Sequence, residues 1–157
     1  MTSISQKLSE LNITLPDAAA PAANYVPFVQ SGALLFISGQ LPFGQGQLIH
    51  KGRLGETVSL EDGYKAARQC AINIIAQIRA AGGLEKVRRI VRLGGFVNST
   101  ADFTDQPKVI NGASDLFVEV FGDAGRHARA AVGVPSLPLG VAVEVDAVVE
   151  LAAFETL

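Results

Sequence analysis

Charged residues are scarce in this chain. Lys, Arg, Asp and Glu make up 18% of its 157 residues, below the roughly 25% of a typical soluble domain, whereas hydrophobic residues reach 48%. The net charge is −2, and the longest basic run is the pair Arg88–Arg89. Nucleic-acid-binding proteins carry a basic stripe or patch. Since the sequence lacks one, its composition argues against nucleic acid as a partner.

Cysteine and long apolar runs are also nearly missing. Cys70 is the one cysteine, so it cannot form a disulfide within the chain, which is typical of a reducing compartment. The helical pattern of Ala and Ile around it predicts a buried structural thiol rather than a nucleophile. No stretch has the length of a membrane span, and the first residues lack the layout of a signal peptide. We therefore expect a cytoplasmic protein that does not engage a membrane.

Metal ligands are sparse as well. His50 and His127 lie far apart in sequence, and no His/Cys cluster has the spacing of a metal site. We expect no metal and no cofactor. The place of His127 at the start of a predicted strand favours a side chain on the surface.

Hydrophobic periodicity and turn residues predict a single α+β domain over residues 1–157, with an N-terminal extension at 1–21. Ser59 is placed to cap a long helix that a Gly-Gly pair ends. Two helices are expected to pack on one face of a mixed sheet, and partner subunits to cover the other face, because few charges are available to solvate it. The predicted elements are a short helix at 4–11, strands at 28–30, 34–38 and 47–51, a helix at 60–81, a strand at 87–97, a helix at 106–120, and strands at 128–134 and 141–152.

The last two predicted strands carry charges inside apolar patterns. If residues 135–140 form a hairpin turn, Arg129 lies opposite Asp146, Ala131 lies opposite Glu144, and all the charges share one face. From spacing alone, a structural ion pair between Arg129 and Asp146 or Glu144 is the favoured interpretation. The sharper hypothesis is that Arg129 binds a ligand carboxylate while an acid holds a water. Which of the two acids lies nearer Arg129 stays open.

Three segments resemble the YjgF/RidA family, also described as endoribonuclease L-PSP. They are "FISGQLP", "NGASDLFVEVFG" and "ARAAVGVPSLPLGVAVEVDAVVEL", and the likeness spans about residues 22–152. The resemblance implies a chorismate-mutase-like fold that forms homotrimers with clefts between subunits. The short extra N-terminal helix resembles a longer subgroup of the family whose function is poorly defined. Active members hydrolyse 2-imino acids to 2-keto acids and ammonia.

The resemblance also implies a set of site residues. Arg129 falls on the family arginine that binds the substrate carboxylate, and Glu144 on the glutamate that positions the attacking water. Three positions depart from the pattern of active members, and at two of them Ala131 replaces a cysteine and Gly133 replaces an acid. Phe28 replaces a tyrosine. The residues expected to line the substrate site are Phe28, Ser38, Gly39, Asn111 and Ala131.

Three functions remain open at this stage. The first is hydrolysis of 2-imino or enamine acids, and the second is a trimer that binds a small carboxylate metabolite without turnover. The third is an endoribonuclease, which ranks last because the sequence carries no evident constellation of histidines or lysines for proton transfer and phosphate charge.

Overall fold

The computed structural model describes residues 2–20 and 23–152. A short helix, α1, is followed by two long helices, α2 and α3, and by a five-stranded sheet and a small ribbon. The helices are α1 (Ile4–Glu10), α2 (Leu60–Ala80) and α3 (Gln106–Phe121), with 3-10 turns η1 (Leu84–Lys86), η2 (Gly122–Gly125) and η3 (Pro138–Gly140). The strands are β1 (Phe28–Ser31), β2 (Leu34–Gln40), β3 (Phe43–Gly44), β4 (Gln47–Leu48), β5 (Val87–Asn98), β6 (Ala128–Val134) and β7 (Val143–Leu151).

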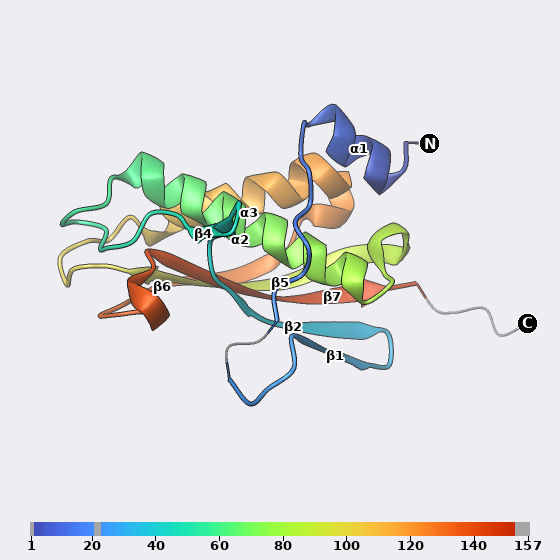
Figure 1. Ribbon diagram of the computed structural model, residues 1–157. Coiled ribbons are helices and arrows are strands. Elements are labelled where there is room, and N and C mark those ends of the chain that lie inside the picture. The colour runs from blue at the N-terminus through green and yellow to red at the C-terminus, as the bar shows by residue number, and fades with distance from the viewer. Residues whose placement is uncertain (1, 21–22, 153–157) are drawn as a thin grey trace, which may run out of the picture.

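The main sheet has the strand order β1-β2-β7-β5-β6, and α2 and α3 lie side by side on one of its faces (Figure 1). This confirms the predicted α+β class with two helices on one face. β5 and β6 are parallel neighbours joined through α3, as expected when a helix crosses over between two strands. The other neighbouring pairs are antiparallel, so the sheet is mixed.

The predicted hairpin between the last two strands is wrong. β5 lies between β6 and β7 and pairs with both of them, so residues 135–142 carry the chain across the end of β5. Arg129 pairs with Leu93 of β5, and Leu93 pairs with Ala147 of β7. The apolar row predicted in β7 is confirmed, since alternate residues of the strand are buried. The alternation of buried and exposed residues in β7 could be predicted from the sequence, whereas the strand with which β7 pairs could not.

The predicted strand at 47–51 is also shorter than expected. Only Gln47–Leu48 is extended, and it pairs with Phe43–Gly44 in a ribbon outside the main sheet. The other predicted elements occur within a few residues of their expected bounds.

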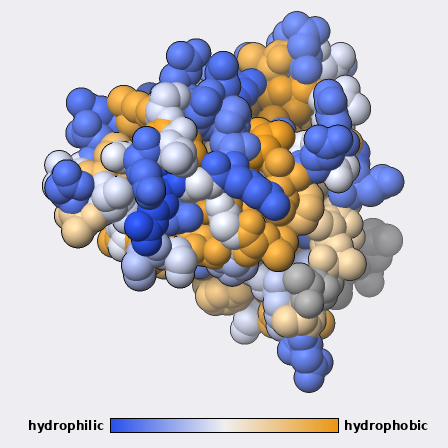
Figure 2. Space-filling model, turned by 60° about the vertical axis from the view of Figure 1, so that its left-hand side comes forward, coloured by the Kyte–Doolittle hydropathy of each residue, from blue (hydrophilic) through white to orange (hydrophobic). Residues whose placement is uncertain are grey.

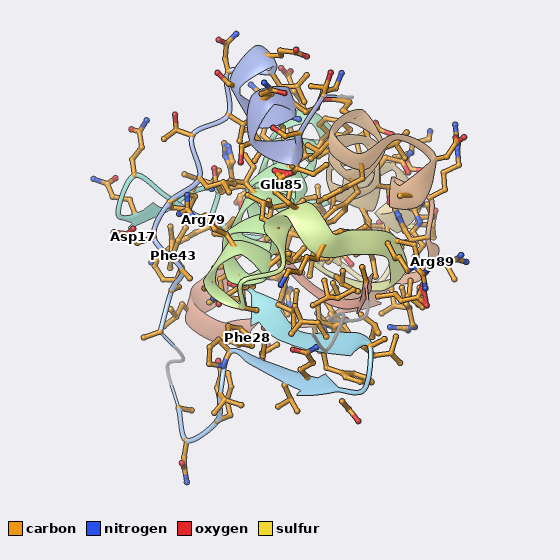
Figure 3. The ribbon with its side chains drawn as sticks, turned by 90° about the vertical axis from the view of Figure 1, so that its right-hand side faces the viewer. Asp17, Phe28, Phe43, Arg79, Glu85 and Arg89 are labelled. Atoms are coloured by element: carbon orange, nitrogen blue, oxygen red, sulfur yellow. The ribbon has the colours of Figure 1, made fainter. Side chains whose placement is uncertain are left out.

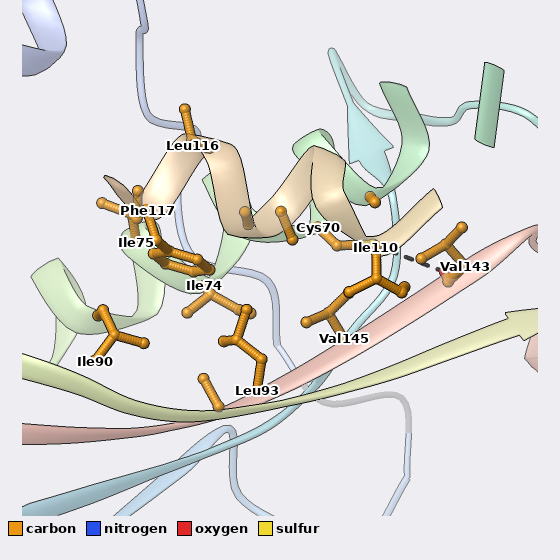
Figure 4. Close-up of a cluster of buried hydrophobic side chains, with 14 of the residues drawn as sticks. Cys70, Ile74, Ile75, Ile90, Leu93, Ile110, Leu116, Phe117, Val143 and Val145 are labelled. Atoms are coloured by element: carbon orange, nitrogen blue, oxygen red, sulfur yellow. Dashed lines mark hydrogen bonds between the residues drawn. The ribbon is translucent and has the colours of Figure 1, made fainter. Parts of the chain in front are cut away.

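The core lies between the two long helices and the sheet. Ser59 caps α2 as predicted, because its Oγ accepts a hydrogen bond from the backbone N–H of Asp62 at 3.1 Å. Ile74 and Phe117 are fully buried against strand residues such as Leu93 (Figure 4). Cys70 is buried among them with its Sγ 3.7 Å from the carbonyl oxygen of Val143, and burial raises the pKa of its thiol well above the usual value. The prediction of a structural thiol is confirmed.

The N-terminal segment is held to the end of α2 and to η1. The Glu85 carboxylate accepts the backbone N–H groups of Ile4 and Ser5 at 3.1 and 2.9 Å, at the N-terminus of α1. Arg79 donates to the carbonyl oxygen of Pro16 at 2.8 Å. In Figure 3, Arg79 and Glu85 both lie beside this segment.

The face of the sheet turned away from α2 and α3, here called the open face, is partly apolar. Val29, Phe36 and Val132 are 53%, 45% and 44% exposed. Their strand partners place the half-buried Val148 and Phe96 on the same face. No described element covers this face, and its burial in a homotrimer stays a prediction. Elsewhere, as in the view of Figure 2, hydrophobic surface is interleaved with hydrophilic side chains. Within residues 2–20 and 23–152, no helix has the length and apolar character to cross a bilayer.

Candidate functional site

The first group of predicted site residues lies on the open face, where β2 meets β7. Glu144 and Asp146 alternate with the buried row of β7, so both carboxylates point away from the helices. The register of β2 shifts between Ile37 and Gln40, and this bulge contains Gly39. A Cβ atom on Gly39 would lie 2.5 Å from Oε1 of Glu144, so the glycine lets the backbone approach the carboxylate closely. We call Glu144, Asp146 and Gly39 the carboxylate cluster.

The two acids of the carboxylate cluster are in different electrostatic environments. Burial and the negative charge of Asp146 both raise the pKa of Glu144. Burial also raises the pKa of Asp146, although Arg92 and the backbone N–H of Gly94 oppose the shift. Nη1 of Arg92 lies 3.9 Å from Oδ1 of Asp146. Glu144 therefore has the character of a base, because no cation of the described residues stabilises its charged form as Arg92 does for Asp146.

The second group lies on the other face, between β6 and α3. Arg129 donates from Nη1 to Oγ of Ser114 at 3.0 Å and from Nη2 to the carbonyl oxygen of Pro107 at 3.2 Å. Ser114 Oγ also lies 2.8 Å from Nε2 of His127. Both of these acceptors are uncharged, so neither of them is a counter-ion for the guanidinium, and its other N–H groups can donate to a ligand. We call Arg129, Pro107, Ser114 and His127 the arginine cluster.

His127 is half-buried, so the expectation of a surface histidine is wrong. Its Nδ1 lies 2.6 Å from the carbonyl oxygen of Gly125, and its ring packs edge-on against Phe117 with 6.1 Å between centroids. Burial lowers the pKa of His127, and the nearby charge of Arg129 lowers it further, against the effect of the Gly125 carbonyl. The sequence carried only one signal that His127 belongs to the arginine cluster, which is that residues 127 and 129 share a strand face.

The structure therefore separates the two residues expected to do the chemistry. Arg129 shares a cross-strand row with Leu93 and Ala147 on the helix face, whereas Glu144 shares one with Phe96 on the open face. The prediction that all these charges share one face is wrong, because it depended on the hairpin. Among the ion pairs of the described residues, none joins Arg129 to Glu144 or Asp146. The favoured interpretation of a structural ion pair is thus also wrong.

The remaining predicted residues divide between the two faces. Ser38 lies at the β2 bulge and donates from Oγ to the carbonyl oxygen of Val26 at 2.8 Å. Asn111 follows Pro107 by one turn of α3 and so lies beside the arginine cluster. Phe28 and Ala131 are partly buried and pack against the core rather than facing Glu144.

The space left by Gly133 is filled by polar groups of the chain. A Cβ atom there would lie 2.6 Å from Oγ of Ser99 and 2.8 Å from Nε2 of Gln106. A longer side chain at this position, such as the acid that the family resemblance implies for active members, would therefore displace both groups.

Residues 5–151 match the family model described as "YjgF/chorismate_mutase-like, putative endoribonuclease". The chain belongs to the YjgF/RidA family. This membership confirms the resemblance drawn from the three sequence segments. The match covers both clusters and also the segment of α1 that begins at Ser5.

Several known proteins are similar to this one over most of its chain. Protein TCP17 of Trypanosoma cruzi is 52% identical over 94% of each chain. A crystal structure of a protein of unknown function from Agrobacterium tumefaciens is 51% identical, covers 94% of this chain and 92% of its own, and superposes with a TM-score of 0.88. The 2-iminobutanoate/2-iminopropanoate deaminase of Salmonella typhimurium is 33% identical over 86% of this chain and 94% of its own.

Proposed function

We propose that this protein hydrolyses 2-imino and enamine acids to 2-keto acids and ammonia, in clefts between the subunits of a homotrimer. One observation carries the proposal. Among the described residues, Arg129 on the helix face has no acidic partner, and the half-buried Glu144 on the open face has no basic partner. The deaminase name of the Salmonella relative supports the same reaction class at 33% identity.

A subunit interface explains why these two groups are unmatched. Burying a charge without a partner is costly, yet the half-buried Arg129 and Glu144 have no partner of opposite charge among residues 2–20 and 23–152 of their own chain. If Arg129 of one subunit faces Glu144 of the next, a ligand between them meets both. Covering the partly apolar open face would also bury Phe36 and Val132.

The reaction requires a substrate held by its carboxylate and a water molecule positioned beside the imine carbon. Arg129 binds the substrate carboxylate, which leaves the imine carbon exposed to attack. The carboxylate of Glu144 accepts a proton from water as the oxygen bonds to that carbon, and it passes this proton to the imine nitrogen to give a carbinolamine. It then accepts the hydroxyl proton of the carbinolamine and delivers it to the amine nitrogen, which leaves as ammonia. The raised pKa of Glu144 suits this exchange, because a stronger base accepts the proton more readily. Carbon–nitrogen cleavage then forms the keto group.

The first test is keto acid release from 2-imino acids generated in situ, with side chains from small to aromatic. Arg129→Ala is expected to abolish the acceleration and Arg129→Lys to retain a small part of it, because lysine lacks the planar fork. Glu144→Gln should lower kcat and leave binding of a 2-keto acid nearly unchanged. Arg126→Ala is the matched control, since Arg126 is exposed and paired only with Asp123 within the described residues. Full activity in folded Arg129→Ala would refute the mechanism.

A mixing experiment tests the subunit arrangement. Arg129→Ala should be inactive alone and Glu144→Gln should have a strongly lowered kcat, but a trimer that contains both kinds of subunit has one cleft with both functional groups. Random co-assembly in equal amounts should restore about a quarter of wild-type activity. No recovery, or a monomeric mass by light scattering, would contradict a site shared between subunits.

Binding without turnover is the second candidate function. Ala131 and Gly133 favour it, because both differ from the residues that active members of the family carry at these positions. In that case 2-keto acids should stabilise the protein saturably, this stabilisation should disappear in Arg129→Ala, and no imino acid in the panel should be hydrolysed faster than in buffer.

A further inference from the structure

A chain of hydrogen bonds leads away from Arg129 into the protein. The guanidinium donates to Ser114, Ser114 contacts Nε2 of His127, and Nδ1 of His127 contacts the carbonyl oxygen of Gly125. The three distances are 3.0, 2.8 and 2.6 Å. The chain spans α3, η2 and the start of β6, so it joins three separate elements around one side chain.

The last hydrogen bond of this series fixes which group donates and which accepts in the others. A carbonyl oxygen only accepts, so Nδ1 of His127 carries the hydrogen that points to Gly125. The burial and the Arg129 charge that lower the pKa of His127 keep the ring neutral near pH 7. Nε2 is then an acceptor, and the hydroxyl group of Ser114 donates a hydrogen bond to it. The oxygen of Ser114 consequently presents a lone pair to Arg129.

The backbone around Gly125 is built to hold that carbonyl in place. A Cβ atom on Gly125 would overlap the carbonyl oxygen of Phe117, so only glycine allows η2 to lie this close to α3. The ring of Phe117 packs edge-on against His127, which holds the imidazole plane. Neither the carbonyl nor the ring can turn without losing a packed contact.

We infer that Ser114 and His127 are positioning residues that hold the Arg129 guanidinium in the orientation in which it binds a carboxylate. The inference rests on the proposed function, since it gives Arg129 a ligand. Ser114 holds Nη1 and Pro107 holds Nη2, both from α3, so a ligand meets the remaining N–H groups of an immobilised fork. The rotamer freedom of the arginine is then lost on folding rather than on binding.

The experiment compares two kinds of substitution at each position. Ser114→Ala and His127→Phe each interrupt the series of hydrogen bonds, and the phenylalanine keeps the ring contact with Phe117. His127→Gln places an amide oxygen where it can accept a hydrogen bond from the hydroxyl group of Ser114. The dissociation constant of a stable 2-keto acid is measured by calorimetry, and kcat and KM are measured with imino acids.

Interrupting the hydrogen-bond series should raise the dissociation constant and KM about five- to tenfold, because immobilising one long side chain costs a free energy of this order. We expect kcat to stay nearly unchanged. His127→Gln should stay within about twofold of wild type, as should the control Arg126→Ala. Unchanged binding in folded Ser114→Ala and His127→Phe would overturn the inference, and so would a fall in kcat at constant KM. If Arg129→Ala itself binds the keto acid normally, the proposed function fails instead.

A measurement on the unmodified protein keeps the inference testable if the variants do not fold. Nitrogen-15 NMR of the imidazole at pH 7 should report His127 as neutral with its proton on Nδ1. A ring with its proton on Nε2, or a charged ring, would show that Ser114 does not receive its hydrogen bond as described.

Discussion

Replacing Gly39 with alanine is expected to impair turnover without unfolding the protein. The new Cβ atom would lie 2.5 Å from Oε1 of Glu144 and 2.9 Å from its Cδ, where ordinary contact begins near 3.4 Å. The carboxylate must therefore move by about 0.9 Å, and a misplacement of roughly 1 Å in a reacting group can cost about 10²-fold in rate.

The same geometry sets a low cost in stability. The crowded atoms are the far end of the Glu144 side chain, which can turn at about 0.5–1.5 kcal/mol. Gly39 is not one of the glycines with positive φ, so alanine adopts its backbone conformation. Removing a glycine from the unfolded chain offsets about 0.4–1 kcal/mol of that cost. The free energy of unfolding should consequently change by less than about 1.5 kcal/mol.

The assay measures kcat and KM for 2-imino acid hydrolysis together with urea denaturation. We expect kcat to fall about 10²-fold, whereas KM stays close to wild type because Arg129 is untouched. Gly83→Ala is the matched control, since its Cβ atom would lie 3.0 Å from Cδ2 of Leu151, away from both clusters. A folded Gly39→Ala protein with wild-type kcat/KM would show that the position of Glu144 does not matter.

Three further predictions concern stability. Gly112→Ala would place a Cβ atom over the carbonyl oxygen of Tyr64 and force α2 and α3 apart, so the free energy of unfolding should fall by about 1–3 kcal/mol or more; an unchanged urea midpoint would contradict this close packing. Glu85→Gln should loosen α1 with a global cost of about 1 kcal/mol or less, detected as faster limited proteolysis between residues 11 and 20, and equal cleavage rates would contradict the role of the carboxylate. His127 has a lowered pKa in the fold, so below about pH 6.5 the unfolded chain binds more protons. Stability should fall from pH 7 to pH 5 more steeply in wild type than in His127→Gln, and parallel curves would refute the shift.

Local signals in the sequence predicted the elements well, for identifiable reasons. The apolar stripe of α2 and its Ser59 cap lie within a few residues of one another, so they can be read without knowing the fold. The same holds for the alternation in β7, where every second side chain is buried. The YjgF/RidA resemblance likewise rested on short segments that contain Gly39, Arg129 and Glu144.

The pairing of strands was not local in this sense. A turn of six residues with two prolines fits a hairpin as well as it fits a crossing over one strand, because the spacing between strands is only about 4.8 Å. The strand–helix–strand order of 87–134 favours parallel pairing between β5 and β6, and β7 then pairs with the other edge of β5, so β6 lies at the edge of the sheet. One exchanged neighbour moved Arg129 to the opposite face from Glu144.

The sequence by itself determined which segments become helices and strands, which family the chain resembles and which charged residues stand out. The tertiary structure alone decided where those charges point, and that His127 and Ser114 join Arg129. The physical reason is the distance along the sequence over which each kind of interaction acts. Periodicity and capping depend on neighbours a few residues away, whereas the contacts of Arg129 lie 15 and 22 residues distant and exist only once α3 has packed against β6.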